Sequence, residues 1–89
     1  MSISIIENDR EAYIKFSDVI TPEDISNYRI LEIYEGNKPV TVMMDSVIWS
    51  NANCESLVGI VLLSENYDNV KIKGLKEEYK NAIDKFLKI

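Results

Sequence analysis

The chain has 89 residues, 46% of them hydrophobic and 28% charged, and its 15 acidic and 10 basic side chains give a formal net charge of −5. This length and composition predict one domain, residues 1–89, that folds alone and is neither disordered nor membrane-embedded. The absence of histidine excludes Ser-His-Asp and Cys-His catalysis and imidazole metal sites, and the acidic balance argues against a nucleic-acid partner.

The cysteine and glycine content excludes further classes of site. The single cysteine, Cys54, excludes an internal disulfide and a paired-thiol redox or zinc site, and it fits a reducing compartment. The three glycines lie too far apart for a phosphate-binding loop. The longest apolar run, Leu57–Leu63, is much shorter than the roughly 20 residues that span a membrane. We therefore expect a cytoplasmic protein with no cofactor, no metal and no membrane insertion.

The first half of the chain predicts a hairpin followed by a helix. Residues Ser2–Ile6 predict a short strand, and the alternation of apolar and polar residues over Ala12–Phe16 predicts a second strand with one buried face. Thr21–Asp24 has the features of a helix start: a threonine cap, a proline at the first position and two acids near the positive end of the helix dipole. This helix is expected to run to about Tyr34 and to end before the turn residues 36–39.

The second half predicts two more strands and two more helices. Val40–Met44 is apolar almost without interruption, which indicates a central strand covered on both faces. Apolar residues at helical spacing over Cys54–Leu62 predict a helix, and Val70–Lys73 predicts an edge strand with lysines on its solvent side. A final amphipathic helix covers Leu75–Phe86. The predicted fold is a single α/β domain with a mixed sheet and the element order β-β-α-β-α-β-α.

One stretch of this pattern resembles a known domain family. The strand Val40–Met44 ends in Asp45, a loop follows, and a helix opens at Asn53-Cys54-Glu55-Ser56-Leu57. With the order of elements, this resembles the STAS domain, the fold of anti-sigma-factor antagonists and of sulfate-transporter C-terminal domains. In that family the helix opens with a pattern of the type Asp-Ser-Ser-Gly-Leu, whose first serine or threonine is the phosphorylation switch. Residues 16–25 are similar to the family's strand, tight turn and first helix, with Asp18 where a glycine is usual.

The alignment to the family's motif decides which residue stands at the switch position. Counted without a gap, Cys54 falls on the phosphorylated serine. A register two residues earlier places Ala52 there, but it puts Glu55 on a core leucine, and burying an unpaired carboxylate is costly. We therefore prefer the first register. In neither register is the switch residue a serine or threonine, so the switch is either lost or taken over by Ser50 or Ser56.

The resemblance implies a non-enzymatic protein–protein interaction module of a bacterial cytoplasm. It also implies two classes of partner: an anti-sigma factor with a kinase-like fold, or the ATPase of a lipid-transport ABC system on which a stand-alone STAS subunit docks. The partner would bind the loop and helix start around residues 49–57. The predicted partner-binding residues are Trp49, Ser50, Asn51, Asn53, Cys54, Glu55 and Ser56.

Other interpretations of these residues stay open. Trp49 is either a plug at the rim of the core or a binding hot spot, and Cys54 is either a small buried side chain or a reactive thiol. Ile60 and Leu63 lie off the apolar stripe of their helix and belong either to the core or to a homodimer surface. A function of another class, in a small-ligand-binding or carboxylate-based enzyme domain, would use Asp18, Asp45 and Glu55.

The charges are unevenly distributed along the chain. Residues 41–69 contain four acids and no base, whereas residues 70–89 contain three acids and six lysines. The segment that resembles the STAS switch therefore lacks cations. We expect its partner to offer a basic or apolar face there, with an association rate that falls as salt is added.

Overall fold

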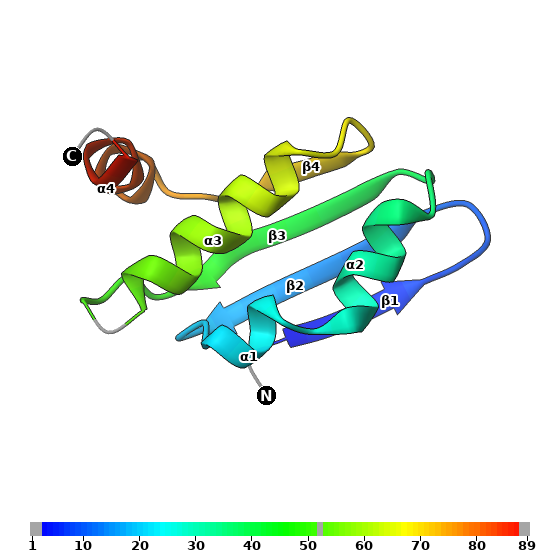
Figure 1. Ribbon diagram of the computed structural model, residues 1–89, viewed down its shortest axis with the longest axis horizontal. Coiled ribbons are helices and arrows are strands. Elements are labelled where there is room, and N and C mark those ends of the chain that lie inside the picture. The colour runs from blue at the N-terminus through cyan, green and yellow to red at the C-terminus, as the bar shows by residue number, and fades with distance from the viewer. Residues whose placement is uncertain (1–2, 52, 88–89) are drawn as a thin grey trace.

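Four strands form one mixed sheet in the order β1-β2-β3-β4 (Figure 1). The computed structural model describes residues 3–51 and 53–87, so Ser2 and Ala52 lie outside the described residues. The strands are β1 (Ile3–Glu7), β2 (Ala12–Asp18), β3 (Val40–Val47) and β4 (Val70–Lys73). The helices are α1 (Pro22–Ile25), α2 (Tyr28–Glu35), α3 (Cys54–Glu65) and α4 (Glu77–Leu87). The predicted fold class and element order are confirmed, with the first predicted helix divided into α1 and α2.

The strand directions follow from the connections between the strands. β1 and β2 pair antiparallel as the predicted hairpin, and β2–β3 and β3–β4 pair parallel. The hairpin turn is closed by the side chain of Asn8, whose Oδ1 accepts hydrogen bonds from the backbone N–H groups of Arg10 and Glu11 at 2.8 and 2.9 Å. The parallel strands are joined by helical crossovers, as this geometry requires.

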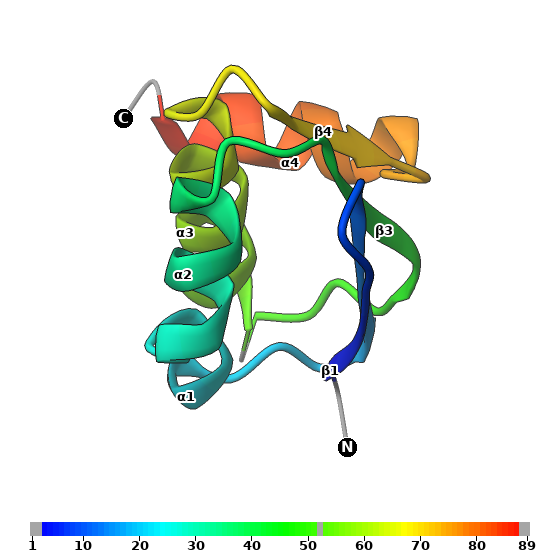
Figure 2. The same cartoon turned by 90° about the vertical axis from the view of Figure 1, so that its right-hand side faces the viewer.

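The core lies between the sheet and the helices α1, α2 and α3, which all cover the same face (Figure 2). Ala12, Ile14 and Phe16 of β2 are buried against these helices, as the alternation predicts. β3 was expected to be covered on both faces, and this is wrong: Thr41 and Met43 point to the other side and are half-exposed. The most deeply buried side chains of the sheet are Ala12, Ile14, Phe16, Val40, Val42, Met44 and Val47.

The first predicted helix is interrupted at Ser26 and Asn27. Thr21 caps α1 as predicted, in a reciprocal box with Asp24. The Asn27 side chain then accepts a hydrogen bond from the Arg29 N–H at 3.0 Å and starts α2. Asparagine favours this local bond over a continuous helix. The break changes the helical phase, so Tyr28, which one continuous helix would place on the core side, is 81% exposed.

α3 packs along the sheet and is apolar over most of its circumference. Ile60 is fully buried and Leu63 is half-buried against the core, whereas Leu62, on the expected apolar stripe, is 40% exposed. Ile60 therefore belongs to the core and is not available as a homodimer contact. At the far end of the helix, the Ser64 hydroxyl donates to the Ile60 carbonyl and bonds the Tyr34 hydroxyl, both at 2.8 Å, which ties α3 to α2.

β4 forms the edge predicted for it, with Lys71 and Lys73 exposed. Gly74 then turns the chain at φ +78°, a left-handed conformation that glycine adopts without strain. α4 follows and crosses α3: it is seen end-on in Figure 1, where α3 is seen from the side. Ile83 is the buried residue of α4. Within the described ranges, none of the helices has the length and apolar character needed to traverse a bilayer.

Candidate functional site

The loop after β3 and the start of α3 lie at the carboxyl end of the parallel strands, where open α/β sheets commonly bind ligands (Figure 1). The loop approaches the segment before α1, because the Ile48 N–H donates to the Asp18 carbonyl at 3.0 Å. Asp18 itself has φ +57°, a conformation uncommon for residues other than glycine. Two chain segments distant in sequence thus form one surface.

Asn53 holds the backbone of this loop. Its Oδ1 accepts hydrogen bonds from the N–H and the hydroxyl of Ser50 at 2.8 and 3.0 Å, and its Nδ2 donates to the Ile48 carbonyl at 2.6 Å. Asn53 occupies the N-cap position of α3, but its side chain makes no cap hydrogen bond. It is 1% exposed. Asn53 therefore organises the loop from the inside and offers no surface for a partner.

The other predicted partner-binding residues divide into buried and accessible ones. Ser56 is 5% exposed, so little of it is accessible to a partner. The Ser50 hydroxyl is engaged by Asn53, and Cys54 is half-buried with its Sγ 3.5 Å from the Asn51 carbonyl oxygen. Asn51 and Glu55 are exposed. The accessible part of the prediction is thus centred on Asn51 and Glu55.

Trp49 joins the loop to the last helix. Its ring stacks on that of Tyr79 in α4, with centroids 6.1 Å apart and an interplanar angle of 28°. The Lys76 ammonium lies 5.4 Å from the centroid of the same Tyr79 ring. Trp49 is half-buried and packs against the core cluster. These contacts favour the interpretation of Trp49 as a plug at the rim of the core.

The structure adds two residues that the sequence interpretation missed. Ile48 is 52% exposed and Val19 is 40% exposed. The backbone hydrogen bond from Ile48 to Asp18 brings their segments together. Strict alternation along β3 would place Ile48 on the buried face with Val40 and Val42. A register shift against β2 brings Val47 to that face instead and leaves Ile48 exposed, so the sequence contained no signal for it. We call Val19, Ile48, Asn51 and Glu55 the loop surface.

The carboxylates that an enzyme or metal site would use are not gathered. Among residues 3–51 and 53–87, no group of three or more Asp, Glu, His or Cys side chains is placed to hold a metal ion. Asp45, one of the three acids considered for catalysis, lies beside Met43 and Gly74 on the side of the sheet away from α1, α2 and α3.

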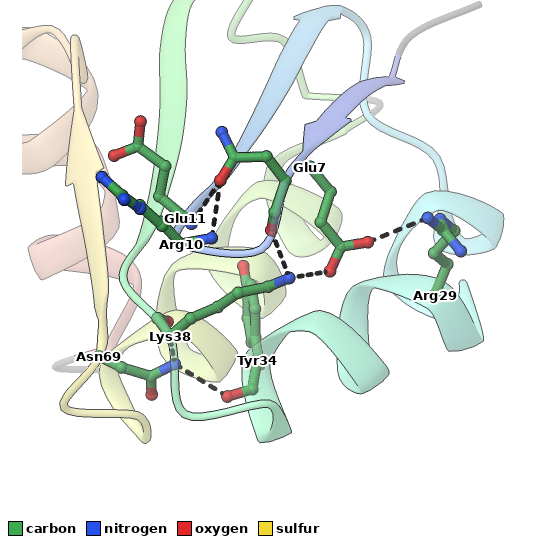
Figure 3. Close-up of polar contacts among 8 residues, drawn as sticks. Glu7, Arg10, Glu11, Arg29, Tyr34, Lys38 and Asn69 are labelled. Atoms are coloured by element: carbon green, nitrogen blue, oxygen red, sulfur yellow. Dashed lines mark hydrogen bonds and ion pairs between the residues drawn. The ribbon is translucent and has the colours of Figure 1, made fainter.

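The opposite end of the sheet contains a polar cluster (Figure 3). Glu7 accepts from Lys38 at 2.7 Å and from Arg29 at 3.1 Å, and the Lys38 ammonium also donates to the Asn8 carbonyl at 2.8 Å. The hydrogen bond from Lys38 is the main reason that the pKa of Glu7 lies below its usual value. These contacts tie the β1–β2 turn to α2 and to the loop before β3.

Asn69 completes this cluster from the loop before β4. Its Nδ2 donates to the carbonyl oxygens of Tyr34 and Lys38 at 3.0 and 2.9 Å (Figure 3). The first of these carbonyls belongs to the last turn of α2, where helices leave such groups without a partner. The cluster therefore joins the β1–β2 turn, α2 and the loops before β3 and β4.

Comparisons of this chain with protein-family models, curated proteins and solved structures found no match.

Proposed function

We propose that this protein is a non-enzymatic interaction module that binds a regulatory protein through the loop surface, as STAS-domain anti-sigma-factor antagonists do, in a bacterial cytoplasm. The observation that carries the proposal is the exposure of two apolar side chains: Ile48, on a loop whose backbone Asn53 holds in place, and Val19, on the neighbouring segment before α1. A preorganised apolar contact binds a partner with a smaller entropic cost than a flexible one.

Two features of the fold support the resemblance on which the proposal rests. The helices α1, α2 and α3 cover one face of a four-stranded sheet, and a loop and helix follow the central strand β3. Asp18 has a positive φ at the position where the family usually has glycine. A residue in that conformation makes the same turn that glycine would make, so the departure from the family's pattern leaves the local backbone intact.

Binding is proposed to be constitutive rather than switched by phosphorylation. Cys54, at the position of the family's phosphorylated residue, has no hydroxyl. Of the two alternative residues, Ser56 is only 5% exposed and the hydroxyl of Ser50 is bonded to Asn53. Glu55 instead supplies a permanent negative charge in the first turn of α3. Such a charge favours a partner with a basic surface next to an apolar one.

Affinity capture from the cell of origin, followed by mass spectrometry, tests the proposal. The variants Ile48→Asp and Glu55→Arg alter the loop surface at exposed positions. Trp49→Ala is less suitable, because the stacking on Tyr79 makes it a change in packing as well. Tyr28→Asp is the matched control, since Tyr28 is 81% exposed on α2, away from the loop. We expect the wild type and the control to retain one partner that both loop variants lose.

The identity of that partner separates the two forms of the proposal. A kinase-like anti-sigma factor supports the antagonist function, and an ATPase of a lipid-transport system supports the role of an ABC-transporter subunit. Ile48→Asp should leave the free energy of unfolding unchanged to within about 0.5 kcal/mol, as for most surface substitutions. If the loop variants capture the same proteins as the wild type does, the loop surface is not the binding site.

A further inference from the structure

The face of the sheet away from α1, α2 and α3 has a surface of its own. Strand register arranges its side chains in two rows: Ser4, Lys15, Met43 and Lys73 in one, and Ile6, Tyr13, Thr41 and Lys71 in the other. We call these eight residues the open face. Figure 2 shows the sheet nearly edge-on, with the layer of α1, α2 and α3 on one side only. Within residues 3–51 and 53–87, no second layer therefore covers the open face.

An uncovered face is unusual for strands paired in this way. The three strands β2, β3 and β4 are parallel, and parallel sheets are normally covered on both faces. The centre of the open face is partly apolar: Met43 and Thr41 are half-exposed, Tyr13 is 36% exposed and Ile6 is 68% exposed. Met43 lies between two lysines of its row, so an apolar strip is bordered by positive charge.

The charge of the open face is opposite to that of the remaining chain. Its three lysines, Lys15, Lys71 and Lys73, are exposed, and none forms an ion pair within residues 3–51 and 53–87. The eight residues contain no acid, so the face carries +3 while the other residues, with 15 acids and seven bases, carry −8. Two carboxylates border it: Asp45, and Glu11, whose hydrogen bond with the Tyr13 hydroxyl raises the pKa of that tyrosine.

We infer that the open face is a second docking surface, which binds an acidic amphipathic helix of a protein partner. The apolar side of such a helix would cover Tyr13 and Met43, and its carboxylates would pair with Lys15 on one flank and with Lys71 and Lys73 on the other. A helix is the element that covers a parallel sheet in layered α/β folds. The open face includes none of the residues of the loop surface, so the inference stands or fails independently of the proposed function.

Site-specific photo-crosslinking in the cell of origin tests this inference. Benzoylphenylalanine is introduced in place of Tyr13, at the centre of the open face, and in place of Tyr28 on α2 as the control position. We expect position 13 to give an adduct with another protein, in a segment that carries acidic and apolar residues at helical spacing. Position 28 should not give this adduct.

Charge-reversal variants then examine the role of the lysines. Lys71→Glu/Lys73→Glu should lower the yield of the adduct by about tenfold, and Lys15→Glu by a smaller factor. Lys76→Glu/Lys80→Glu, which changes the net charge equally just before α4 and in its first turns, should leave the yield within about twofold. Circular dichroism checks that each variant is folded, and Lys15→Glu provides the test on a different strand if the double variant unfolds.

Every other outcome overturns the inference. An adduct with a second copy of this chain would identify an oligomer interface, and an adduct with lipid or RNA would identify a different class of ligand. A crosslinked segment without acidic residues, or a yield that the open-face variants leave unchanged, would remove the role of the lysines. The absence of any adduct specific to position 13 would show that the open face is not a docking surface.

Discussion

The two ends of the sheet are built in different ways. At the β1–β2 turn, the side chains of Glu7, Lys38 and Asn69 connect the turn, α2 and the loops before β3 and β4. At the carboxyl end, Asn53 holds its own loop and Trp49 stacks on α4. At the first end, the polar side chains form bonds with other segments of the chain. At the second end, the apolar side chains of Ile48 and Val19 are exposed. This difference is the basis on which we propose that the second end, and not the first, binds a partner.

The largest effect is expected from Gly74→Ala, at the carboxyl end. A Cβ added to Gly74 would lie 2.8 Å from the Asp45 Cβ and 2.9 Å from the Asp45 backbone nitrogen, and φ is +78°. Because both the clash and the left-handed conformation oppose a side chain, we expect a loss of about 3 kcal/mol in the free energy of unfolding. Urea denaturation measures this loss.

Gly36→Ala is the control for this substitution. A Cβ at Gly36 would lie 3.4 Å from the nearest carbonyl oxygen, and the residue has φ −74°. We expect its free energy of unfolding to change by less than about 1 kcal/mol. The expected direction is a small increase in stability. Equal losses in both variants would mean that the contact with Asp45 does not determine the cost.

A pair of asparagine variants compares the two ends directly. Asn53→Ala leaves the Ile48 carbonyl and the Ser50 N–H without their partner, and Asn69→Ala does the same to the carbonyls of Tyr34 and Lys38. We expect each to cost about 2 kcal/mol of unfolding free energy, since buried polar groups lose their hydrogen bonds. Thermal and urea unfolding measure these costs.

Partner capture should separate these two variants. Asn53→Ala frees the loop and should abolish binding of the partner, whereas Asn69→Ala should retain it at temperatures where both proteins are folded. Asn51→Ala, at an exposed position of the same loop, serves as the control for stability. If Asn69→Ala loses the partner as completely as Asn53→Ala, the separation between a stabilising end and a binding end is wrong.

The regular part of the fold was predictable because local chemistry determined it. The alternation over β2 and the Thr21 cap each specify one arrangement, and both are found. The division of the first helix was not predictable, because Asn27 is tolerated within a helix and its competing bond to Arg29 depends on how α2 packs. Likewise, the apolar run of β3 predicts burial but does not say that one face lacks a covering layer.

The site was less predictable than the fold. A sequence places Asn53 at a helix start, where its side chain would normally cap the helix. The structure turns that side chain into the loop, which changes Asn53 from a surface residue into a buried support. α3 is apolar over most of its circumference, so its pattern could not say that Ile60 is buried and Leu62 is exposed. In both cases the missing information is the direction from which other elements approach.

The smallest effect is expected from the ion pairs of Glu7. The pKa of Glu7 lies below its usual value of 4.5, mainly because Lys38 donates a hydrogen bond to its charged form. A lowered pKa in the folded state means that the unfolded chain binds the proton more readily. The contribution of Glu7 to stability is therefore fully present above about pH 4.5 and is lost as the pH falls through the lower, folded-state pKa.

Unfolding experiments between pH 3 and 7 on the wild type and on Glu7→Gln measure this contribution. We expect the two proteins to converge in stability as the pH falls, and added salt to reduce their difference at pH 7, because the pairs are partly exposed. The comparison of the two ends predicts that Glu7→Gln leaves partner capture unchanged at neutral pH. A variant that stays folded but loses the partner would place the binding surface at the β1–β2 turn, opposite the loop surface.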